Sequence, residues 1–174
     1  VGYTTGGIYF NRTSLEGQAR KVVETYTKLS AAGVSVICWF KLFDDQVKGG
    51  VRRSASSEKF FGLAYPNFIA KPAGASYRLL AKHLQGAVLI PPSDFEPAVI
   101  ASGGIEMYYY QNEAGEKFIV AYGGGKSAEL TLRDYSAEIL TINLLSGIHS
   151  RTSGSSTIKV DAPLLIKLAA NPNP

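Results

Sequence analysis

The stretch "GVSVICWFKLFDDQ", from Gly33 to Gln46, decides how the first half of the chain folds. Its first part, Val34 to Phe40, is almost unbroken apolar sequence, which is typical of a parallel strand that is buried on both faces. It ends in two adjacent aspartates, Asp44 and Asp45, so we expect the chain to pass from the core to solvent there. A strand of this kind needs other strands on both of its edges.

A helix is predicted on each side of this strand. Ser14 is a suitable N-cap for the first helix, and Gly33 supplies its stop. The second helix is expected to begin at Pro72, a residue that suits the first turn, and to run to about Leu84. The apolar face of the first helix is predicted from residues at helical spacing, which are Leu15, Ala19, Val22, Val23, Tyr26 and Leu29.

The second half of the sequence is predicted to be all β. Turn-forming segments such as "NEAGE" and "SGSS" separate short apolar or alternating runs. Six or more strands at this spacing indicate a small antiparallel β-sandwich. We place the domain boundary near the two prolines at 91 and 92, which gives domains of residues 1–90 and 91–174. The expected strands are Ile105–Gln111, Lys117–Tyr122, Ser127–Leu132, Glu138–Leu144, Thr157–Val160 and Leu164–Leu168.

The composition excludes several classes of protein. The chain has 174 residues with a globular proportion of apolar residues, and its single cysteine, Cys38, excludes an internal disulfide. No apolar run is long enough for a membrane span, so we expect no membrane partner. Lys48, Arg52 and Arg53 form the one tight basic cluster, and they lack the interleaved aromatic residues of a nucleic-acid surface. We therefore expect no nucleic-acid partner.

The first half of the chain is physically incomplete by itself. A single parallel strand with two helices satisfies neither its own edges nor its two apolar faces. We therefore expect this half to be the end of a larger α/β sheet or barrel, with Val1 to Tyr3 as the tail of the preceding strand. The chain is predicted to be a fragment of a divided fold or one subunit of it.

Four segments, in a set order, resemble a known group of enzymes. The sequence "VGYTT" is followed by "GQARKVVETYTKLSAAGV", "VICWFKLFDD" and "FGLAYPNFIAKPAGASYRLLAKHL". This order resembles the C-terminal part of a clan A glycoside hydrolase, of the family 39-like or family 5-like kind. The resemblance implies the last portion of a (β/α)8 barrel: the end of strand 7, helix 7, strand 8 and helix 8. A small antiparallel β-sandwich would follow.

The same resemblance places the catalytic carboxylates outside this chain. In such enzymes the nucleophilic glutamate lies at the end of the seventh strand, so it is expected immediately before Val1, and the acid/base glutamate lies further upstream. Retaining hydrolysis needs two carboxylates about 5 Å apart. No catalytic residue is therefore assigned in this chain, and we expect the isolated polypeptide to be inactive.

Trp39 and Tyr3 are candidate substrate-binding residues. The resemblance places Trp39 at the C-terminal end of the eighth strand, where the active sites of such barrels lie. An indole face there could stack on a sugar ring; the alternative is a core tryptophan. Tyr3 would follow the expected nucleophile by three positions and contact either that glutamate or the substrate, with packing as the alternative.

Asp44, Asp45 and Lys41 complete the candidate substrate-binding set. The acidic pair is expected to order the loop after the strand or to contact sugar hydroxyls. An acid/base role for the two is disfavoured because adjacent side chains point apart and the reaction needs a defined gap. Lys41 could reach the cleft, although an outward, solvated lysine is the ordinary alternative.

The remaining expectations concern cofactors, location and rival functions. The two histidines, His83 and His149, have no second ligand at metal-binding spacing, so neither a metal nor a cofactor is expected. We expect a secreted or extracytoplasmic protein that acts on carbohydrate, together with a missing barrel portion or a companion chain. Two alternatives remain: a non-catalytic assembly protein on a decayed hydrolase scaffold, and a carbohydrate-binding module.

Overall fold

The computed structural model describes residues 2, 3, 5, 13–45, 57–95, 98–123, 128–133 and 137–168. It divides into two compact units, Val1–Leu79 and Leu80–Pro174, and each is described here by itself. The predictions on Val1 and on the basic cluster of Lys48, Arg52 and Arg53 lie outside the described residues. The predicted domain boundary at residues 90 and 91 stays a prediction.

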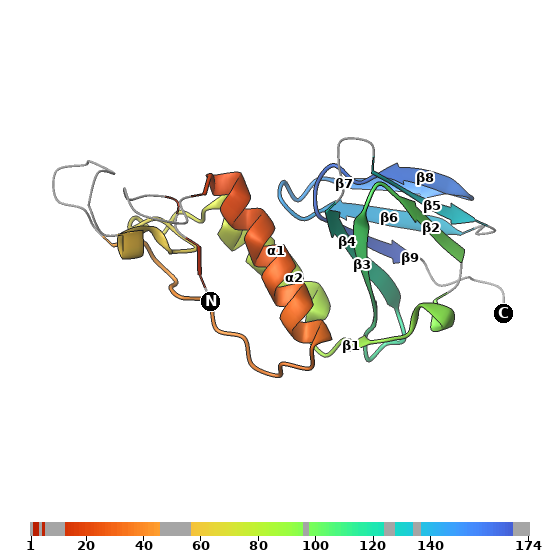
Figure 1. The fold of residues 1–174 in the computed structure, drawn as a ribbon, viewed down its shortest axis with the longest axis horizontal. Coiled ribbons are helices and arrows are strands. Elements are labelled where there is room, and N and C mark those ends of the chain that lie inside the picture. The colour runs from red at the N-terminus through yellow and green to blue at the C-terminus, as the bar shows by residue number, and fades with distance from the viewer. Residues whose placement is uncertain are drawn as a thin grey trace. The chain divides into compact units, whose positions relative to one another are not determined.

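The two predicted helices are confirmed (Figure 1). Helix α1 spans Leu15–Ala31, and the side chain of Ser14 caps it by accepting a hydrogen bond of 2.8 Å from the Gly17 N–H. Gly33, at φ +79°, takes the left-handed conformation that ends the helix. Helix α2 spans Pro72–Leu84. The buried face of α1 is formed by Gln18, Ala19, Val22, Val23 and Thr27.

The predicted buried strand at Val34 to Phe40 is wrong as stated. This segment forms no strand among the described residues, and its side chains are not buried: Val36 is 75% exposed and Phe40 is 55% exposed. The physical reason is that a parallel strand needs neighbours to accept and donate its backbone hydrogen bonds, and the described part of the first unit supplies none. The described residues therefore show no barrel.

A compact loop region follows this segment. After a short 3-10 helix, Ser57–Phe60, the chain runs back beside residues 41–45. Phe43 forms a parallel bridge with Ala64, which forms an antiparallel bridge with Ala70. These bridges bring the residues just after the predicted strand close to the start of α2.

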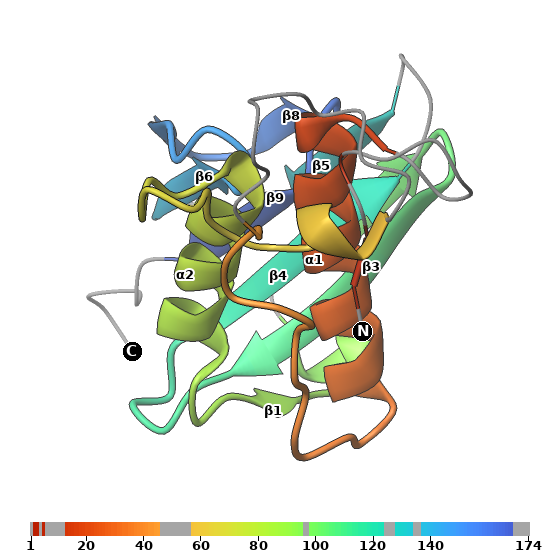
Figure 2. The same cartoon turned by 90° about the vertical axis from the view of Figure 1, so that its left-hand side faces the viewer.

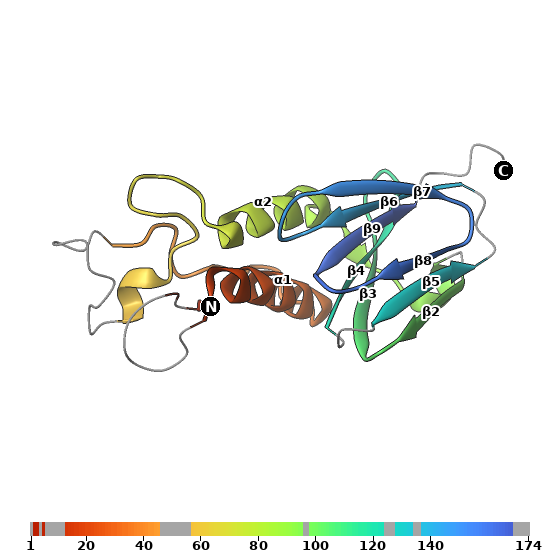
Figure 3. The same cartoon turned by 90° about the horizontal axis from the view of Figure 1, so that it is seen from above.

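The second unit contains a sandwich-like β region of two antiparallel sheets (Figure 3). The larger sheet has six strands in the order β1-β3-β4-β9-β6-β7, with β1 at one edge beside β3 (Figure 2). The smaller sheet has three strands in the order β2-β5-β8. The larger sheet consists of β1 (Val88–Leu89), β3 (Ile105–Gln111), β4 (Lys117–Gly123), β6 (Glu138–Asn143), β7 (His149–Ser153) and β9 (Leu164–Leu168). The smaller consists of β2 (Ala98–Ser102), β5 (Glu129–Arg133) and β8 (Ser156–Lys159).

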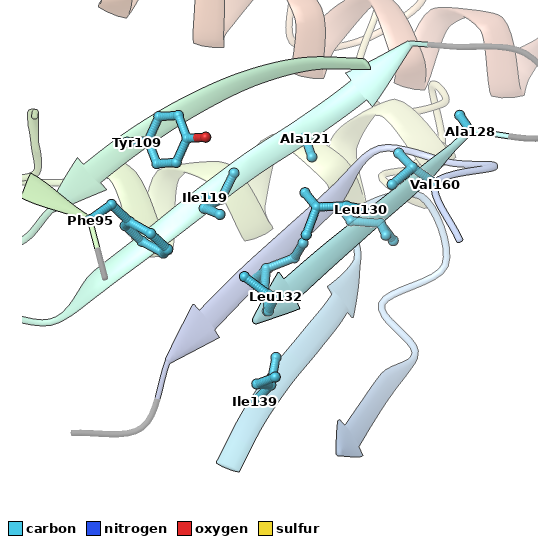
Figure 4. Close-up of a cluster of buried hydrophobic side chains, with 11 residues drawn as sticks. Phe95, Tyr109, Ile119, Ala121, Ala128, Leu130, Leu132, Ile139 and Val160 are labelled. Carbon is cyan, nitrogen blue, oxygen red and sulfur yellow. The ribbon is translucent and has the colours of Figure 1, made fainter. Parts of the chain in front are cut away.

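The core of the sandwich lies between the two sheets (Figure 4). Leu130 and Leu132 of β5 are fully buried and share this core with Ile119 of β4 and Ile139 of β6. Phe95, which follows the short 3-10 helix Pro92–Asp94, packs edge-on against Tyr109, with ring centroids 5.2 Å apart. The predicted sandwich is therefore confirmed as an architecture of two antiparallel layers.

Candidate functional site

Trp39 lies among aromatic side chains of the first unit. Its ring centroid is 6.1 Å from that of Tyr3 and 6.3 Å from that of Tyr26 on α1, which it stacks against at 24°. The indole Nε1–H donates a hydrogen bond of 3.0 Å to the carbonyl oxygen of Phe61. The indole is therefore half-buried and held at its polar edge.

Gln18 of α1 joins Tyr3 to the same backbone. Its side chain is fully buried, and its Nε2 donates to the carbonyl oxygen of Tyr3 at 2.6 Å. The same nitrogen lies 3.4 Å from the carbonyl oxygens of both Phe61 and Gly62. The structure thus brings together Tyr3 and Trp39, two of the predicted site residues, around one short segment of chain.

Asp44 is buried in an ion pair with Lys71. Its Oδ1 accepts hydrogen bonds from Lys71 Nζ at 2.7 Å and from the Gly62 N–H at 2.8 Å. The Lys71 side chain has no exposed area, and its ammonium group also donates to Thr5 Oγ1 at 3.2 Å and to the Phe60 carbonyl at 3.3 Å. This pair fixes the loop after the predicted strand, which is one of the two roles expected for Asp44.

Asp45 and Lys41 form a separate, more exposed ion pair. The Lys41 ammonium contacts Asp45 Oδ1 and also lies 5.9 Å from the ring centroid of Phe40. Asp44 and Asp45 therefore point apart and contact different lysines, which is the arrangement expected for adjacent residues. Lys41 and Asp45 remain predicted substrate contacts on the partly exposed rim of this loop.

Gly62 makes the close packing of this site possible. A Cβ atom at this position would lie 2.2 Å from the backbone nitrogen of Asp44 and 2.8 Å from the carbonyl oxygen of Ala64. No side chain fits there without moving the backbone, so glycine is needed for the Asp44 carboxylate to reach the Gly62 N–H.

Burial changes the acidity of one aromatic residue in this region. Burial, and secondarily the neighbouring Tyr77, raises the pKa of Tyr26 to about 12. Its hydroxyl group donates to the Ile37 carbonyl at 3.4 Å, and its ring meets that of Tyr77 edge-on at 5.2 Å. Tyr26 is therefore neutral at physiological pH and acts as an aromatic support for Trp39.

Sequence reasoning missed Lys71, Gln18 and Gly62. Lys71 stands one residue before the predicted helix, and it pairs with a carboxylate 27 positions earlier, for which the sequence contains no local signal. Gln18 lies on the predicted apolar face of α1, where a polar residue is a weak sign of a buried hydrogen bond.

Among the described residues, no group of three or more metal-ligand side chains lies close enough to hold a metal ion. No described helix is long and apolar enough to cross a membrane.

The comparisons with known proteins give a likeness of structure but not of sequence. No protein-family model matches the chain, and no curated protein matches it by sequence. A solved structure described as a family 39 glycoside hydrolase from the gut symbiont Bacteroides cellulosilyticus WH2 superposes with a TM-score of 0.70 at 15% sequence identity. The match covers 97% of this chain but only 32% of that chain. The fold is therefore similar to about a third of a family 39 glycoside hydrolase.

Proposed function

We propose that this chain is the C-terminal part of a retaining glycoside hydrolase that acts on a polysaccharide or glycoside. The similarity of fold to part of a family 39 enzyme supports this proposal. The single observation that carries it is segment 34–42, which has the apolar sequence of a buried strand but, among the described residues, pairs with no strand and exposes apolar side chains.

The backbone of this segment is short of hydrogen-bond partners. From Ser35 to Ile37 and from Trp39 to Leu42, no backbone N–H donates to any residue that the structure describes. From Val36 to Leu42 its side chains alternate between exposed and partly buried. We call the exposed residues other than Ser35 the strand stripe: Val34, Val36, Cys38, Phe40 and Leu42.

The carbonyl oxygens of Lys41 and Leu42 do accept hydrogen bonds, from the N–H groups of Leu63 and Ala64. The unpaired N–H groups and the exposed apolar side chains together favour cover by another segment. The proposed cover is the missing portion of the barrel, carried by the same protein or by a companion chain.

The reaction determines which residues each part of the proposed assembly would supply. Both carboxylates of a double displacement would come from the covering portion, one as nucleophile and one as acid/base group. This chain would contribute the Trp39 indole and Tyr3 as substrate contacts, with Lys41 and Asp45 on the rim. Asp44 is given the loop-ordering role, which its burial against Lys71 supports. Action on polysaccharide also supports a secreted or extracytoplasmic location.

The first test identifies what covers the strand stripe. We would purify the protein from its source and determine the intact mass and N-terminal sequence of every polypeptide that stays bound to this chain. The proposal expects a glutamate directly before Val1, in a longer polypeptide or at the end of a companion. That assembly is expected to hydrolyse at least one of a panel of chromogenic aryl glycosides with retention of anomeric configuration. Its variant with that glutamate changed to glutamine should lose activity.

Matched substitutions connect the activity to this chain. Val36→Asp puts a charge in the strand stripe and is expected to abolish both assembly and hydrolysis. Ile148→Asp is the control, since Ile148 is 69% exposed and lies in the second unit, outside the strand stripe. Equal loss with both variants, or hydrolysis that survives Val36→Asp, would contradict the proposal.

One rival function rests on the same observation. A second copy of this chain could cover the strand stripe, which would make the protein a non-catalytic assembly unit. Sedimentation of the purified protein separates the two: a homodimer that hydrolyses none of the aryl glycosides would overturn the hydrolase proposal. Glycan binding that needs only the sandwich would instead favour a carbohydrate-binding module.

A further inference from the structure

We infer that the buried Lys71–Asp44 ion pair is a positioning device for the indole of Trp39, and that it thereby controls how Trp39 meets carbohydrate. The first statement concerns this chain alone. The second rests on the proposed function, in which Trp39 contacts the substrate. Neither Lys71 nor Asp44 is given a chemical role in the reaction.

The connection runs through a single peptide group. The N–H of Gly62 and the C=O of Phe61 belong to the same planar peptide unit. Asp44 Oδ1 accepts from that N–H at 2.8 Å, and Trp39 Nε1–H donates to that C=O at 3.0 Å. Because the peptide unit is rigid and planar, its orientation about the chain fixes both hydrogen bonds together. A carboxylate at one end of the unit therefore sets where the indole is held at the other.

The charge of Asp44 strengthens this hold. A hydrogen bond to an ionised carboxylate is shorter and stronger than one between neutral groups. In a buried setting, neighbouring hydrogen bonds also polarise one another, so the carboxylate at the N–H makes the Phe61 oxygen a better acceptor for the indole. The effect depends on the position of the Asp44 carboxylate.

Lys71 holds the Asp44 carboxylate in place. Its ammonium group is 2.7 Å from Asp44 Oδ1, and the two side chains are 0% and 6% exposed. The same ammonium donates to the Phe60 carbonyl, which belongs to the preceding peptide unit of the chain. Two consecutive peptide units are thus held by one buried ion pair. Without Lys71 the carboxylate would be a buried, uncompensated charge, which proteins avoid by moving or neutralising the group.

Gln18 contacts the same segment through longer hydrogen bonds. Its Nε2 lies 3.4 Å from the carbonyl oxygens of Phe61 and Gly62, longer than the Trp39 and Asp44 contacts. Gln18 therefore supports the position of the segment, while the shorter contacts fix the tilt of the peptide unit that faces Trp39.

The test reads the indole hydrogen bond directly. Trp39 is the one tryptophan of the chain, so a proton–nitrogen correlation spectrum of the labelled protein contains one indole signal. We would measure the exchange rate of this proton with water in the unaltered protein and in Lys71→Met. The variant is expected to exchange at least about tenfold faster, the ratio that corresponds to a loss of roughly 1.4 kcal/mol. Backbone amides of Val22 and Val23 should stay protected in both.

Two further variants make the result decisive. Lys21→Met is the matched control, because it removes an exposed lysine that pairs with Glu24 in the same unit; it should change indole exchange by less than about twofold. The double variant Asp44→Asn with Lys71→Met removes both charges but keeps an oxygen acceptor for the Gly62 N–H. It is expected to recover at least half of the protection lost in Lys71→Met, on a logarithmic scale. If Lys71→Met fails to fold, the double variant alone tests the inference. Indole exchange in the double variant as fast as in the denatured chain would overturn the inference.

A carbohydrate arm separates this inference from the proposed function. Cellohexaose and mannohexaose would be titrated into the unaltered protein while the indole signal is followed. A shift with either sugar, together with at least about tenfold weaker binding in Lys71→Met than in Lys21→Met, supports both statements. The absence of a shift with both sugars rejects the carbohydrate statement, while the exchange rates still decide the positioning statement. Slow indole exchange in a folded Lys71→Met protein, equal to that of the unaltered protein, would overturn the inference whatever the sugars do.

Discussion

Asp44 and Asp45 show how two identical neighbouring residues acquire different roles. Asp44 is buried against Lys71 and Gly62, whereas Asp45 lies on the surface with Lys41. A buried ion pair adds little net stability when it is compared with an apolar replacement, but removing one partner is costly because the other is left as a buried charge. The two aspartates should therefore respond very differently to the same substitution.

Asp44→Ala is predicted to lower the free energy of unfolding of the first unit by about 3–5 kcal/mol, because Lys71 would be left as a buried, uncompensated cation. Asp45→Ala is the control and should cost less than about 1 kcal/mol, as expected for an exposed pair. Urea denaturation followed by Trp39 fluorescence measures both. If Asp44→Ala and Asp45→Ala lowered the stability equally, Asp44 would not be the structurally important one of the two aspartates.

His83 is predicted to make the second unit less stable in mild acid. Burial is the main cause that lowers the pKa of His83. The nearby Lys167, Lys82 and His149 lower the pKa further, while Glu116 raises it. The unfolded state therefore binds a proton more readily than the folded state, so stability is present above the unfolded pKa of about 6.5 and falls as the pH drops below it. Thermal melts between pH 7.5 and 5 should show a smaller loss for His83→Gln than for the unaltered protein. An identical loss in both would rule out His83 as the source.

At the scale of elements, helices and sandwich strands could be predicted because their signals are local. The cap at Ser14, the stop at Gly33 and the first-turn proline at Pro72 each mark a helix end: α1 begins after Ser14 and ends before Gly33, and α2 begins at Pro72. The bounds of β3 and β9 agree with the prediction. Three strands were missed because they lack alternation of apolar and polar residues: β1 has two residues, β2 is almost wholly apolar, and β7 is polar throughout.

The same reasoning misplaced residues 34–40 because burial is not a local property. The apolar run indicates a strand, but whether a strand forms depends on neighbours that a sequence window cannot contain. The residues of the candidate site also differ in whether the sequence indicates them. Trp39 and Tyr3 were proposed from the family resemblance, whereas Lys71 and Gln18 were missed, because their contacts join distant parts of the chain.

Ser14→Ala tests the best local signal. The Ser14 hydroxyl accepts from the Gly17 N–H, so its loss leaves a donor of the first turn of α1 without a side-chain partner. The variant is expected to lower stability by about 1 kcal/mol in chemical denaturation. Ser35→Ala, at an exposed position outside any helix, should change stability by less than about 0.5 kcal/mol. A cap that contributes nothing measurable would show that packing alone fixes the start of α1.

At the scale of the whole molecule, two regions contrast in how their apolar residues are used. The sandwich buries its apolar residues between two sheets, as Leu130 and Leu132 show. The strand stripe of the first unit, by contrast, exposes apolar residues on a segment that forms no strand with any described residue. The protein thus buries apolar residues in a core in one region and, in the other, has an apolar surface that no described residue of the first unit covers.

Substitutions of leucine distinguish these two environments. Leu130→Ala is expected to cost about 2–5 kcal/mol, since it removes fully buried methyl groups and leaves a cavity between the sheets. Leu42→Ala, at 60% exposure in the strand stripe, should cost less than about 0.5 kcal/mol in the isolated chain. In the proposed assembly, however, Leu42→Ala should weaken association, which titration with the covering portion would measure. No effect of Leu42→Ala in either setting would argue against the strand stripe as a contact surface.

The position of β9 has a consequence for synthesis. This strand is the last in the described chain, yet it lies in the middle of the six-stranded sheet, paired with Phe118–Ala121 of β4 on one side and with Ile139–Asn143 of β6 on the other. Until β9 leaves the ribosome, the larger sheet exists only as two separate groups, β1-β3-β4 and β6-β7. A nascent chain stalled before Leu164 would expose the edges of both groups, so we expect it to be the species that chaperones bind and proteases remove.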